Sequence, residues 1–515
     1  MFVKSYGSAV VGIEAITVAV EVNISAGIGL YMVGLPDNAV RESQERIRAA
    51  FENCSYKMSG RKVVVNLAPA DIRKEGSAYD LPIAVAVLAA TEQVDSAPLA
   101  RYVLMGELSL DGSLLPVRGA LPIAIQAQKE GFKGVILPKQ NAAEAAVVGS
   151  LEVYGAGHLR EVVGFLCGEH TLSRTTVDLE GRFRENAERF AEGSYPDMAD
   201  VLGQAMAKRA LEIAAAGGHN VLMIGPPGSG KTMLARRMPS IMPPMTLQEA
   251  LETTKIHSVA GKLGAETGLL VTRPFRSPHH LTSQAALVGG GTSPQPGEIS
   301  LAHNGILFAD ELPEFGRSLL ETLRQPMEDK VITVSRSKYT VQYPANFMLV
   351  ASMNPCPCGY YNHPTKACVC SHGAVSKYLN RISGPMLDRI DLHIEVIPVD
   401  FSELSQPGAA ESSAAIRSRV VAARQVQTER FAGTPVYTNA MMNSRQLREF
   451  CPLSAESSAL LRKAMERFNL SARAYDRILK VSRTIADLAG GGRIEPAHIA
   501  EAIGYRTLDR DTWGA

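Results

Sequence analysis

Residues 221–232 read VLMIGPPGSGKT, and this stretch decides the fold of the central part of the chain. The apolar run at residues 221–224 predicts a strand, the pattern G-x-x-x-x-G-K-[ST] follows, and helical periodicity continues to Met238. Glycines let backbone N–H groups wrap a phosphate, and the amino end of a helix adds partial positive charge. The sequence therefore predicts an α/β domain with a P-loop for ATP. The residues expected to contact the nucleotide are Gly225, Pro226, Pro227, Gly228, Ser229, Gly230, Lys231 and Thr232.

Two carboxylates downstream of the P-loop predict the magnesium and water chemistry. Residues 305–311 read GILFADE, an apolar strand that ends in Asp310 and Glu311. We expect Lys231 to reach the β- and γ-phosphates, and the Thr232 hydroxyl and Asp310 to hold Mg²⁺. Glu311 is placed to polarise the water that attacks the γ-phosphate. An apolar run before Asp-Glu is moderately specific alone and becomes a strong ATPase signal downstream of a P-loop.

A third apolar strand, residues 347–352, leads to Asn354. An amide at the tip of a strand beside the P-loop strand can orient the attacking water, so we include Asn354 among the catalytic candidates. The alternative is an asparagine that forms a turn before Pro355.

Composition limits the class of protein. The chain has 515 residues, of which 46% are hydrophobic and 20% are charged, and this length allows several globular domains. No apolar run reaches the roughly 18 residues of a membrane helix, and residues 1–22 do not fit a signal peptide, so we expect a cytoplasmic protein. The formal net charge of +1 means that any contact with DNA depends on a local basic surface.

The texture of the sequence predicts three domains. Residues 1–170 alternate strand-like runs, such as 62–67 and 134–137, with helical stretches, such as 38–52 and 120–130. The polar residues 171–195 read as a linker, and 196–400 form the P-loop domain. Residues 401–515 predict a helical lid. Its expected helices are residues 414–431, 444–450, 457–468, 472–488 and 496–505.

Four of the seven cysteines form a compact pattern. Cys356, Cys358, Cys368 and Cys370 make two C-x-C pairs, and four thiolates can complete a tetrahedral structural zinc site. The usual pairing is C-x-x-C, so reduced thiols without metal remain the alternative. His363 or His372 could replace one thiolate. A disulfide is disfavoured in a reducing compartment.

Residues 384–391, GPMLDRID, and 470–479, LSARAYDRIL, resemble segments of magnesium-chelatase-like AAA+ ATPases. The resemblance implies a homo-hexameric ring with Arg389 as the arginine finger acting on a neighbour's nucleotide, Arg473 as the sensor-2 arginine of the lid and Asn354 as the sensor-1 residue. Arg381 is a second candidate for the finger. For each arginine, a surface salt bridge is the alternative.

Residues 273–280, RPFRSPHH, also resemble this AAA+ module, in which two hairpin insertions are common. Residues 256–272 are a candidate for a hairpin inserted in the second helix, and residues 331–343 alternate like a second hairpin. The second hairpin would carry Arg336, Lys338 and Tyr339 near its tip, where basic and aromatic groups can grip phosphate and stack on bases. The alternative is an ordinary exposed polar tip.

The first domain resembles the proteolytic domain of Lon protease at residues 74–82, KEGSAYDLP, and 106–119, GELSLDGSLLPVRG. Lon uses a serine–lysine dyad, but Ala78 aligns with the serine and Leu121 with the lysine. We therefore expect a domain that does not catalyse peptide hydrolysis, with a role for the neighbouring Ser77 as the alternative.

Together these segments resemble the YifB-type, magnesium-chelatase-like family of bacterial AAA+ ATPases over nearly the whole chain. The resemblance implies a hexameric, Mg-ATP-dependent DNA helicase or translocase that promotes branch migration during natural transformation. It implies single-stranded, branched or three-stranded DNA as partner, and recombination proteins as further candidate partners. The alternative is a chelatase-like motor for metal insertion or protein remodelling, and an ATP-dependent protease is a third hypothesis.

Overall fold

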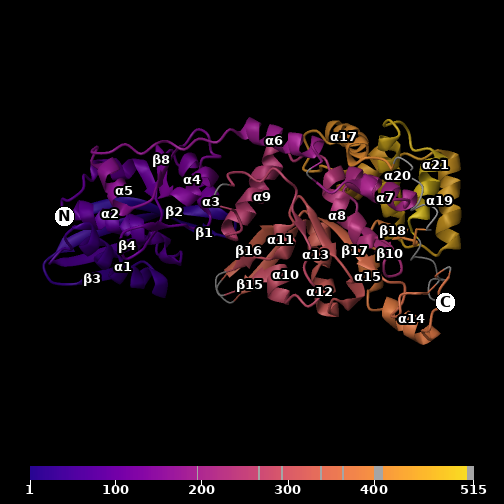
Figure 1. The fold of residues 1–515 in the computed structure, drawn as a ribbon, viewed down its shortest axis with the longest axis horizontal. Helices are drawn as coiled ribbons and strands as arrows, with labels where there is room; N and C mark the ends of the chain where they lie inside the picture. The colour runs from indigo at the N-terminus through magenta and orange to yellow at the C-terminus, as the bar shows by residue number, and fades with distance from the viewer. Residues whose placement is uncertain are drawn as a thin grey trace.

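The computed structural model describes residues 1–193, 195–264, 267–291, 294–336, 339–361, 363, 365–399 and 410–506, without the side chains of residues 191, 336 and 339. Three regions follow one another along the long axis of the molecule (Figure 1). The N-terminal α/β region lies at one end, a second α/β region in the middle and a helical region at the other end. The mixed α/β class expected from the sequence is confirmed.

The N-terminal region contains a seven-stranded sheet in the order β3-β4-β2-β1-β5-β8-β9. Strands β1, β2 and β4 pair antiparallel, whereas β5, β8 and β9 pair parallel. Residue alternation in β4 buries Val63, Val65 and Leu67, as its sequence predicts. The strands are β1 (Phe2–Val11), β2 (Glu14–Ser25), β3 (Leu30–Val33), β4 (Lys62–Ala68), β5 (Tyr102–Leu104), β8 (Gly134–Pro138) and β9 (Glu152–Ala156).

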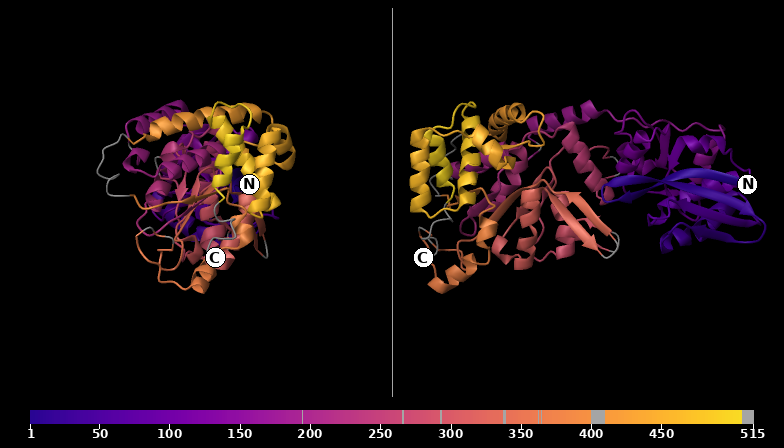
Figure 2. Two further views of the ribbon diagram at one scale, coloured as in Figure 1. Left: turned by 90° about the vertical axis from the view of Figure 1, so that its right-hand side faces the viewer. Right: turned by 180° about the vertical axis from the view of Figure 1, so that it is seen from behind.

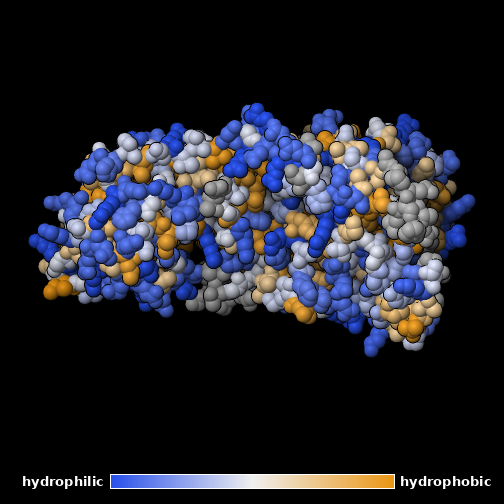
Figure 3. Space-filling view, viewed as in Figure 1, coloured by the Kyte–Doolittle hydropathy of each residue, from blue (hydrophilic) through white to orange (hydrophobic). Residues whose placement is uncertain are grey.

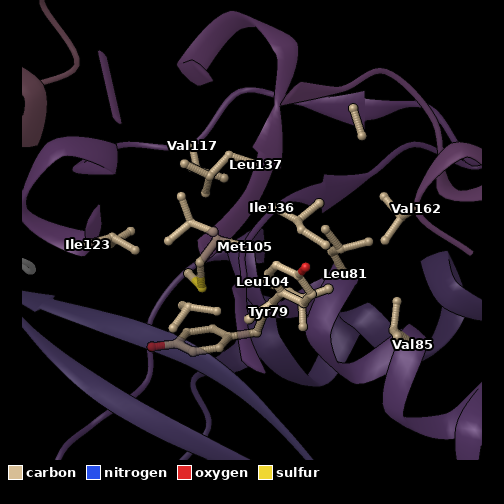
Figure 4. Packing of buried hydrophobic residues seen from close by; sticks show 14 of the residues in the cluster. Tyr79, Leu81, Val85, Leu104, Met105, Val117, Ile123, Ile136, Leu137 and Val162 are labelled. Carbon is tan, nitrogen blue, oxygen red and sulfur yellow. The ribbon is translucent and has the colours of Figure 1, made fainter. Parts of the chain in front are cut away.

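Helices pack on this sheet and complete its core. Helix α2 (Asp80–Ala90) is buried over its whole length, which explains its almost unbroken apolar sequence. Figure 4 shows Leu81 and Val85 of this helix close to Leu104 and Ile136 of the sheet. The other helices are α1 (Asn38–Cys54), α3 (Ala120–Lys129), α4 (Lys139–Ala145) and α5 (Leu159–Leu166).

The middle region contains a five-stranded parallel sheet in the order β11-β14-β17-β10-β18. Every residue of β10, β14 and β17 is buried, as expected for parallel strands covered on both faces. The strands are β10 (Val221–Ile224), β11 (Phe275–Arg276), β14 (Ile306–Ala309), β17 (Met348–Met353) and β18 (Leu392–Glu395). The longer helices are α7 (Ala205–Gly217), α8 (Lys231–Ile241), α9 (Leu247–Val259) and α14 (His372–Leu379), with shorter ones at α12 (Arg317–Thr322), α13 (Arg324–Asp329) and α15 (Gly384–Leu387).

The C-terminal region is helical, and its helices lie close to their predicted positions. They are α17 (Ser413–Arg430), α18 (Ser444–Phe450), α19 (Ala455–Arg467), α20 (Ala472–Leu488) and α21 (Pro496–Gly504). Ser412, Asn443, Ser454 and Ser471 accept hydrogen bonds as N-caps and fix where four of these helices begin.

Two segments differ from the sequence-based expectation. Residues 171–195 contain the helix α6 (Leu179–Ala191), capped by Asp178, although the polar composition predicted only a linker. The hairpin expected at residues 256–272 is wrong for the part that the structure describes: helix α9 continues to Val259, and residues 260–264 and 267–272 form no strand. The second expected hairpin is confirmed as β15 (Val331–Arg336) paired with β16 (Tyr339–Pro344).

The two α/β regions meet where the end of α9 reaches α3. The Ser258 hydroxyl donates to Glu144, the Gly119 N–H donates to the Ser258 carbonyl at 3.3 Å, and Lys255 lies 3.0 Å from Glu14. Burial raises the pKa of the Glu144 carboxyl. In the right-hand view of Figure 2, the β1–β2 hairpin and the β15–β16 hairpin approach each other beside this contact.

None of the described helices has the length and apolar content needed to cross a bilayer. On the face shown in Figure 3, apolar residues form scattered patches among hydrophilic ones.

A buried carboxylate organises the helical region, and we expect its removal to unfold that region. Asp487 has no exposed side-chain surface and lies 2.6 Å from Arg430 and 3.0 Å from Arg483. Asp487→Ala leaves two guanidinium groups without their partner, so we expect a loss of about 3–5 kcal/mol in unfolding free energy. Thermal and urea unfolding measure it. Glu466→Ala, at an exposed position of α19, is the control, and equal stability of the two variants would contradict the assignment.

Candidate nucleotide-binding site and cysteine cluster

The P-loop connects β10 to α8 and places Lys231 at the first position of the helix. A Cβ atom at Gly225 would lie 2.1 Å from the Val396 carbonyl oxygen, so only glycine fits there. Gly230 has a φ of 95°, which again favours glycine. The loop geometry explains the glycine spacing that predicted the motif.

Lys231 is buried and held by the loop itself. Its Nζ donates to the carbonyls of Gly225 at 2.6 Å and Pro226 at 2.9 Å, and lies 3.4 Å from Asn354 Oδ1. Burial lowers the pKa of Lys231 to about 8, against the opposing effects of Asp310 and Glu311. Phosphate oxygens at the amino end of α8 would stabilise the charged ammonium.

Asp310 meets the P-loop across the sheet. It follows β14, and its Oδ2 accepts from the Thr232 hydroxyl at 3.1 Å, while its Oδ1 accepts from the Ser352 hydroxyl. A hydroxyl and a carboxylate are oxygen ligands of the type that Mg²⁺ takes, so the pair fits a magnesium ion. Ser352, at the end of β17, was missed by the sequence analysis, because a serine inside an apolar strand gives no signal of this contact.

Glu311 is next to Asp310 and turns toward solvent. Its backbone has a φ of 55°, in the left-handed region that non-glycine residues seldom occupy, and such conformations concentrate at functional sites. Its side chain is 55% exposed and lies 3.5 Å from Nδ1 of His280. His280 belongs to the RPFRSPHH segment, whose sequence resembles the AAA+ module but predicted no chemical role for its residues. The structure therefore joins that segment to the expected catalytic base.

The two candidates for the arginine finger lie at opposite ends of the parallel strands. Arg389 lies at the amino edge, where its carbonyl accepts from Asn220 at 3.2 Å; it is 6% exposed and its Nη2 lies 2.9 Å from Glu328. Arg381 is exposed, but it lies 2.7 Å from Glu314, close to this chain's own Glu311. In this arrangement Arg389 is too buried to reach into a neighbouring subunit. Arg381 lies beside this chain's own nucleotide site, whereas a finger that serves a neighbour would lie on the face opposite that site.

Arg473 is exposed in the first turn of α20. One turn further, Arg477 lies 3.0 Å from Asp391, which directly precedes β18, so α20 is tied to the central sheet. Burial opposes ionisation of Asp391, but Arg477 and His219 hold its pKa well below the usual value. The lid arginine is therefore carried on a helix that is anchored to the nucleotide-binding domain.

The four cysteines of residues 356–370 lie together as expected. Their Sγ atoms lie within 4.8 Å of one another, with 3.3 Å between Cys356 and Cys358 and 3.5 Å between Cys358 and Cys368. Thiolates bound at about 2.3 Å in a tetrahedron would lie about 3.8 Å apart, so the set fits one zinc ion. Within the described residues, neither candidate histidine belongs to the cluster.

The cysteine cluster touches the P-loop. Gly359 directly follows Cys358, has a φ of 84°, and a Cβ atom there would lie 2.5 Å from Cδ of Pro227. On the other side of the cluster, the Met353 carbonyl accepts from the Gly225 N–H at 3.2 Å. A metal that fixes this loop would therefore also restrict the P-loop.

In the first domain, the two positions that align with the serine and lysine of Lon protease carry no catalytic group. Leu121 is fully buried and Ala78 carries no reactive group, while the Ser77 hydroxyl donates to Glu107. In the described part of the chain, no lysine or histidine hydrogen-bonds to Ser77.

The hairpin positions expected to contact nucleic acid cannot be placed: Lys338 and the side chains of Arg336 and Tyr339 lie outside the described residues.

The fold and the site define a magnesium-chelatase-like AAA+ ATPase. Residues 197–404 match the family described as "Magnesium chelatase, subunit ChlI", 20–141 match "Subunit ChlI of Mg-chelatase", and 410–506 match "Magnesium chelatase, subunit ChlI C-terminal". The parallel sheet, the P-loop and the helical region all fall within these matches.

Two relatives that are similar over nearly the whole chain, and a third that is similar over part of it, narrow the family. Competence protein ComM of Haemophilus influenzae is 46% identical over 98% of this chain and 97% of its own length. The protein YifB of Escherichia coli is 45% identical over 98% of this chain and 96% of its own. The Magnesium-chelatase 67 kDa subunit of Chlorobaculum tepidum is 28% identical over 30% of this chain and 23% of its own. The chain therefore belongs to the competence-related ComM and YifB family.

The contact between Gly359 and Pro227 gives a direct test of the link between the cluster and the P-loop. In Gly359→Ala, the new methyl group would displace Pro227, so we expect the affinity for a fluorescent ATP analogue to fall about tenfold. The metal content of the protein, measured by mass spectrometry, should be the same in the variant and the wild type.

Gly433→Ala is the matched control, since Gly433 has a φ of 77° but nothing within 4 Å of a Cβ atom. An equal loss of nucleotide affinity in both variants would mean that backbone strain, rather than the P-loop contact, is responsible.

Proposed function

We propose that this chain is a Mg-ATP-dependent DNA translocase that works as a homo-hexamer and drives branch migration of recombination intermediates in natural transformation. One observation carries the proposal: Lys231, Thr232, Asp310 and Asn354 lie together at one sheet edge, in a chain similar to a competence protein over 98% of its length. ATP hydrolysis supplies energy for movement, and competence concerns DNA that enters the cell. This role would place the chain in the cytoplasm.

The residues at the sheet edge support in-line hydrolysis of ATP. Backbone N–H groups of Gly228–Thr232 at the start of α8 face the phosphates, and Lys231 leaves its carbonyl partners to pair with them. Thr232 and Asp310 would hold Mg²⁺, which neutralises charge on the phosphates when bound. Glu311 orients the attacking water and takes its proton after release from His280, and Asn354 holds that water in line.

A ring would complete the site. AAA+ mechanisms use a guanidinium supplied by a neighbour to stabilise the transferring phosphoryl group. Arg389 would have to exchange Glu328 for the neighbour's nucleotide, and Arg381 would have to leave Glu314. Arg473 on the anchored lid helix would contact the γ-phosphate. Because both arginines are held by other groups in the single chain, we expect ATP hydrolysis to depend on assembly of the ring.

DNA contact is assigned to the β15–β16 hairpin. Single-stranded, branched or three-stranded DNA would pass the tip, where Arg336 and Lys338 meet phosphates and Tyr339 stacks on a base. The four cysteines would hold structural zinc, which leaves no open coordination position for catalysis. Recombination proteins are further candidate partners.

A chelatase-like motor is the second candidate. The similarity to the magnesium-chelatase 67 kDa subunit and the three family matches favour it. Such a motor would work together with a second subunit, either to insert a metal ion into its acceptor or to remodel a protein. ATP turnover that rises with such a subunit and ignores DNA would select this alternative.

Two substitutions separate nucleotide binding from hydrolysis. Lys231→Ala removes the ammonium that pairs with the phosphates, so ATP binding and all motor activity should be lost. Glu311→Gln cannot accept a proton, so ATP should remain bound while hydrolysis falls about 10²–10⁴-fold. ATP-analogue titration, phosphate release and resolution of three-stranded junctions measure these effects.

Lys463→Ala, on an exposed position of the lid, is the control and should behave as wild type. Junction resolution by Lys231→Ala at the wild-type rate would refute ATP-driven movement.

A further inference from the structure

A cavity of about 580 Å³ lies between the N-terminal domain and the nucleotide-binding domain. The N-terminal domain supplies most of its wall, including Val10, Ser77 and Glu107. The nucleotide-binding domain supplies Gln295, Val259 at the end of α9, and Val341, which belongs to the β15–β16 hairpin. Anything bound here would touch both domains.

One wall is the open edge of a β-strand. Strand β1 pairs with β2 along its length, from Phe2↔Asn23 to Val11↔Glu14, but with β5 only at Tyr6↔Val103. Beyond Tyr6, the side of β1 that faces away from β2 has no partner strand in the described sheet.

The pairing pattern shows which backbone groups face the cavity. A two-residue turn, Gly12–Ile13, closes the hairpin, so Val11 and Glu14 form a hydrogen-bonded pair and Val10 and Ala15 do not. The N–H and C=O of Val10 therefore turn away from β2. The Ser8 N–H, two residues earlier, turns the same way and meets Met105 Sδ at 3.1 Å.

Side chains of the buried core form one part of the wall, here called the apolar floor, and polar groups contribute to the rest. Tyr79, Met105, Val117 and Ile123 belong both to the buried core and to the lining, and Figure 4 shows Met105 beside the ring of Tyr79. The Gln295 Oε1 atom is buried and has no hydrogen-bond partner. A buried acceptor of this kind is suited to an N–H of a ligand.

The charges of the lining disfavour a polyanion. Three carboxylates, Asp37, Glu75 and Glu107, outnumber the two guanidinium groups of Arg73 and Arg118. Arg73 already lies 3.6 Å from Glu75. Nucleic acid would meet net negative charge here, whereas a cationic side chain would be attracted.

We propose that this cavity binds an extended, basic segment of a partner polypeptide, which adds as a short strand to β1 beside Val10. Only a polypeptide in extended conformation offers N–H and C=O groups in the spacing that the free strand edge requires. Its alternate side chains enter the apolar floor, and a lysine or arginine faces Glu107. Since Val341 and Gln295 complete the wall, the segment binds the two domains together.

The test uses the full chain and a fluorescein-labelled nonapeptide of alternating valine and lysine, with binding followed by fluorescence anisotropy. Val10→Pro removes the free N–H without removing a bond to β2, so affinity should fall about tenfold, while Val10→Ala keeps the N–H and stays near wild type. Ala78→Trp fills the cavity and should abolish binding. Thermal unfolding confirms that each variant is folded, and Ala78→Trp decides the matter if Val10→Pro does not fold.

Saturable binding that both variants weaken supports the site. Absence of saturable binding, equal affinity in the wild type and Ala78→Trp, or displacement of the peptide by a single-stranded oligonucleotide would overturn it. Lys231→Ala should bind the peptide normally, so the result does not depend on ATP hydrolysis.

Discussion

The carboxyl ends of three parallel strands meet at one edge, and the chemistry of the molecule depends on that meeting. Lys231 after β10, Asp310 after β14 and Asn354 after β17 come together there because β17 lies between β10 and β14. The register is fixed by buried apolar side chains along all three strands, so the polar groups can converge only at the strand ends. A buried lysine held by loop carbonyls places an amino group at this edge, where a phosphate can pair with it.

Other parts of the chain contact either the P-loop or the domain that carries it. The cysteine cluster touches Pro227 through Gly359, and the lid helix α20 reaches the sheet through Arg477 and Asp391. The N-terminal domain contacts the nucleotide-binding domain through α9, whose Ser258 donates to Glu144. Of these three contacts, the one made by the candidate metal site involves the P-loop itself, whereas the lid contact lies at the opposite, amino edge of the sheet.

Local sequence patterns predicted the parts that depend on local rules. The P-loop, the β15–β16 hairpin and the lid helices follow from glycine spacing, alternation and periodicity, and the clustering of the four cysteines follows from their proximity in the chain. The sequence did not predict α6, because its polar residues resemble a linker, and it predicted a hairpin where α9 continues. Contacts between distant segments, such as His280 with Glu311, have no local signature. The burial of Arg389 is likewise a tertiary property.

In the proposed mechanism, ATP is split at a site completed by a neighbouring copy of the chain, and a finger arginine reaches that site only after it leaves its present partner, Glu328 for Arg389 or Glu314 for Arg381. The most direct measurement is the ATP turnover rate per chain, followed as the protein concentration is raised with a three-stranded DNA junction present. We expect the rate per chain to rise steeply as rings assemble and then to level off. A rate per chain that stays constant from the monomeric range upward would contradict an active site shared between neighbouring copies.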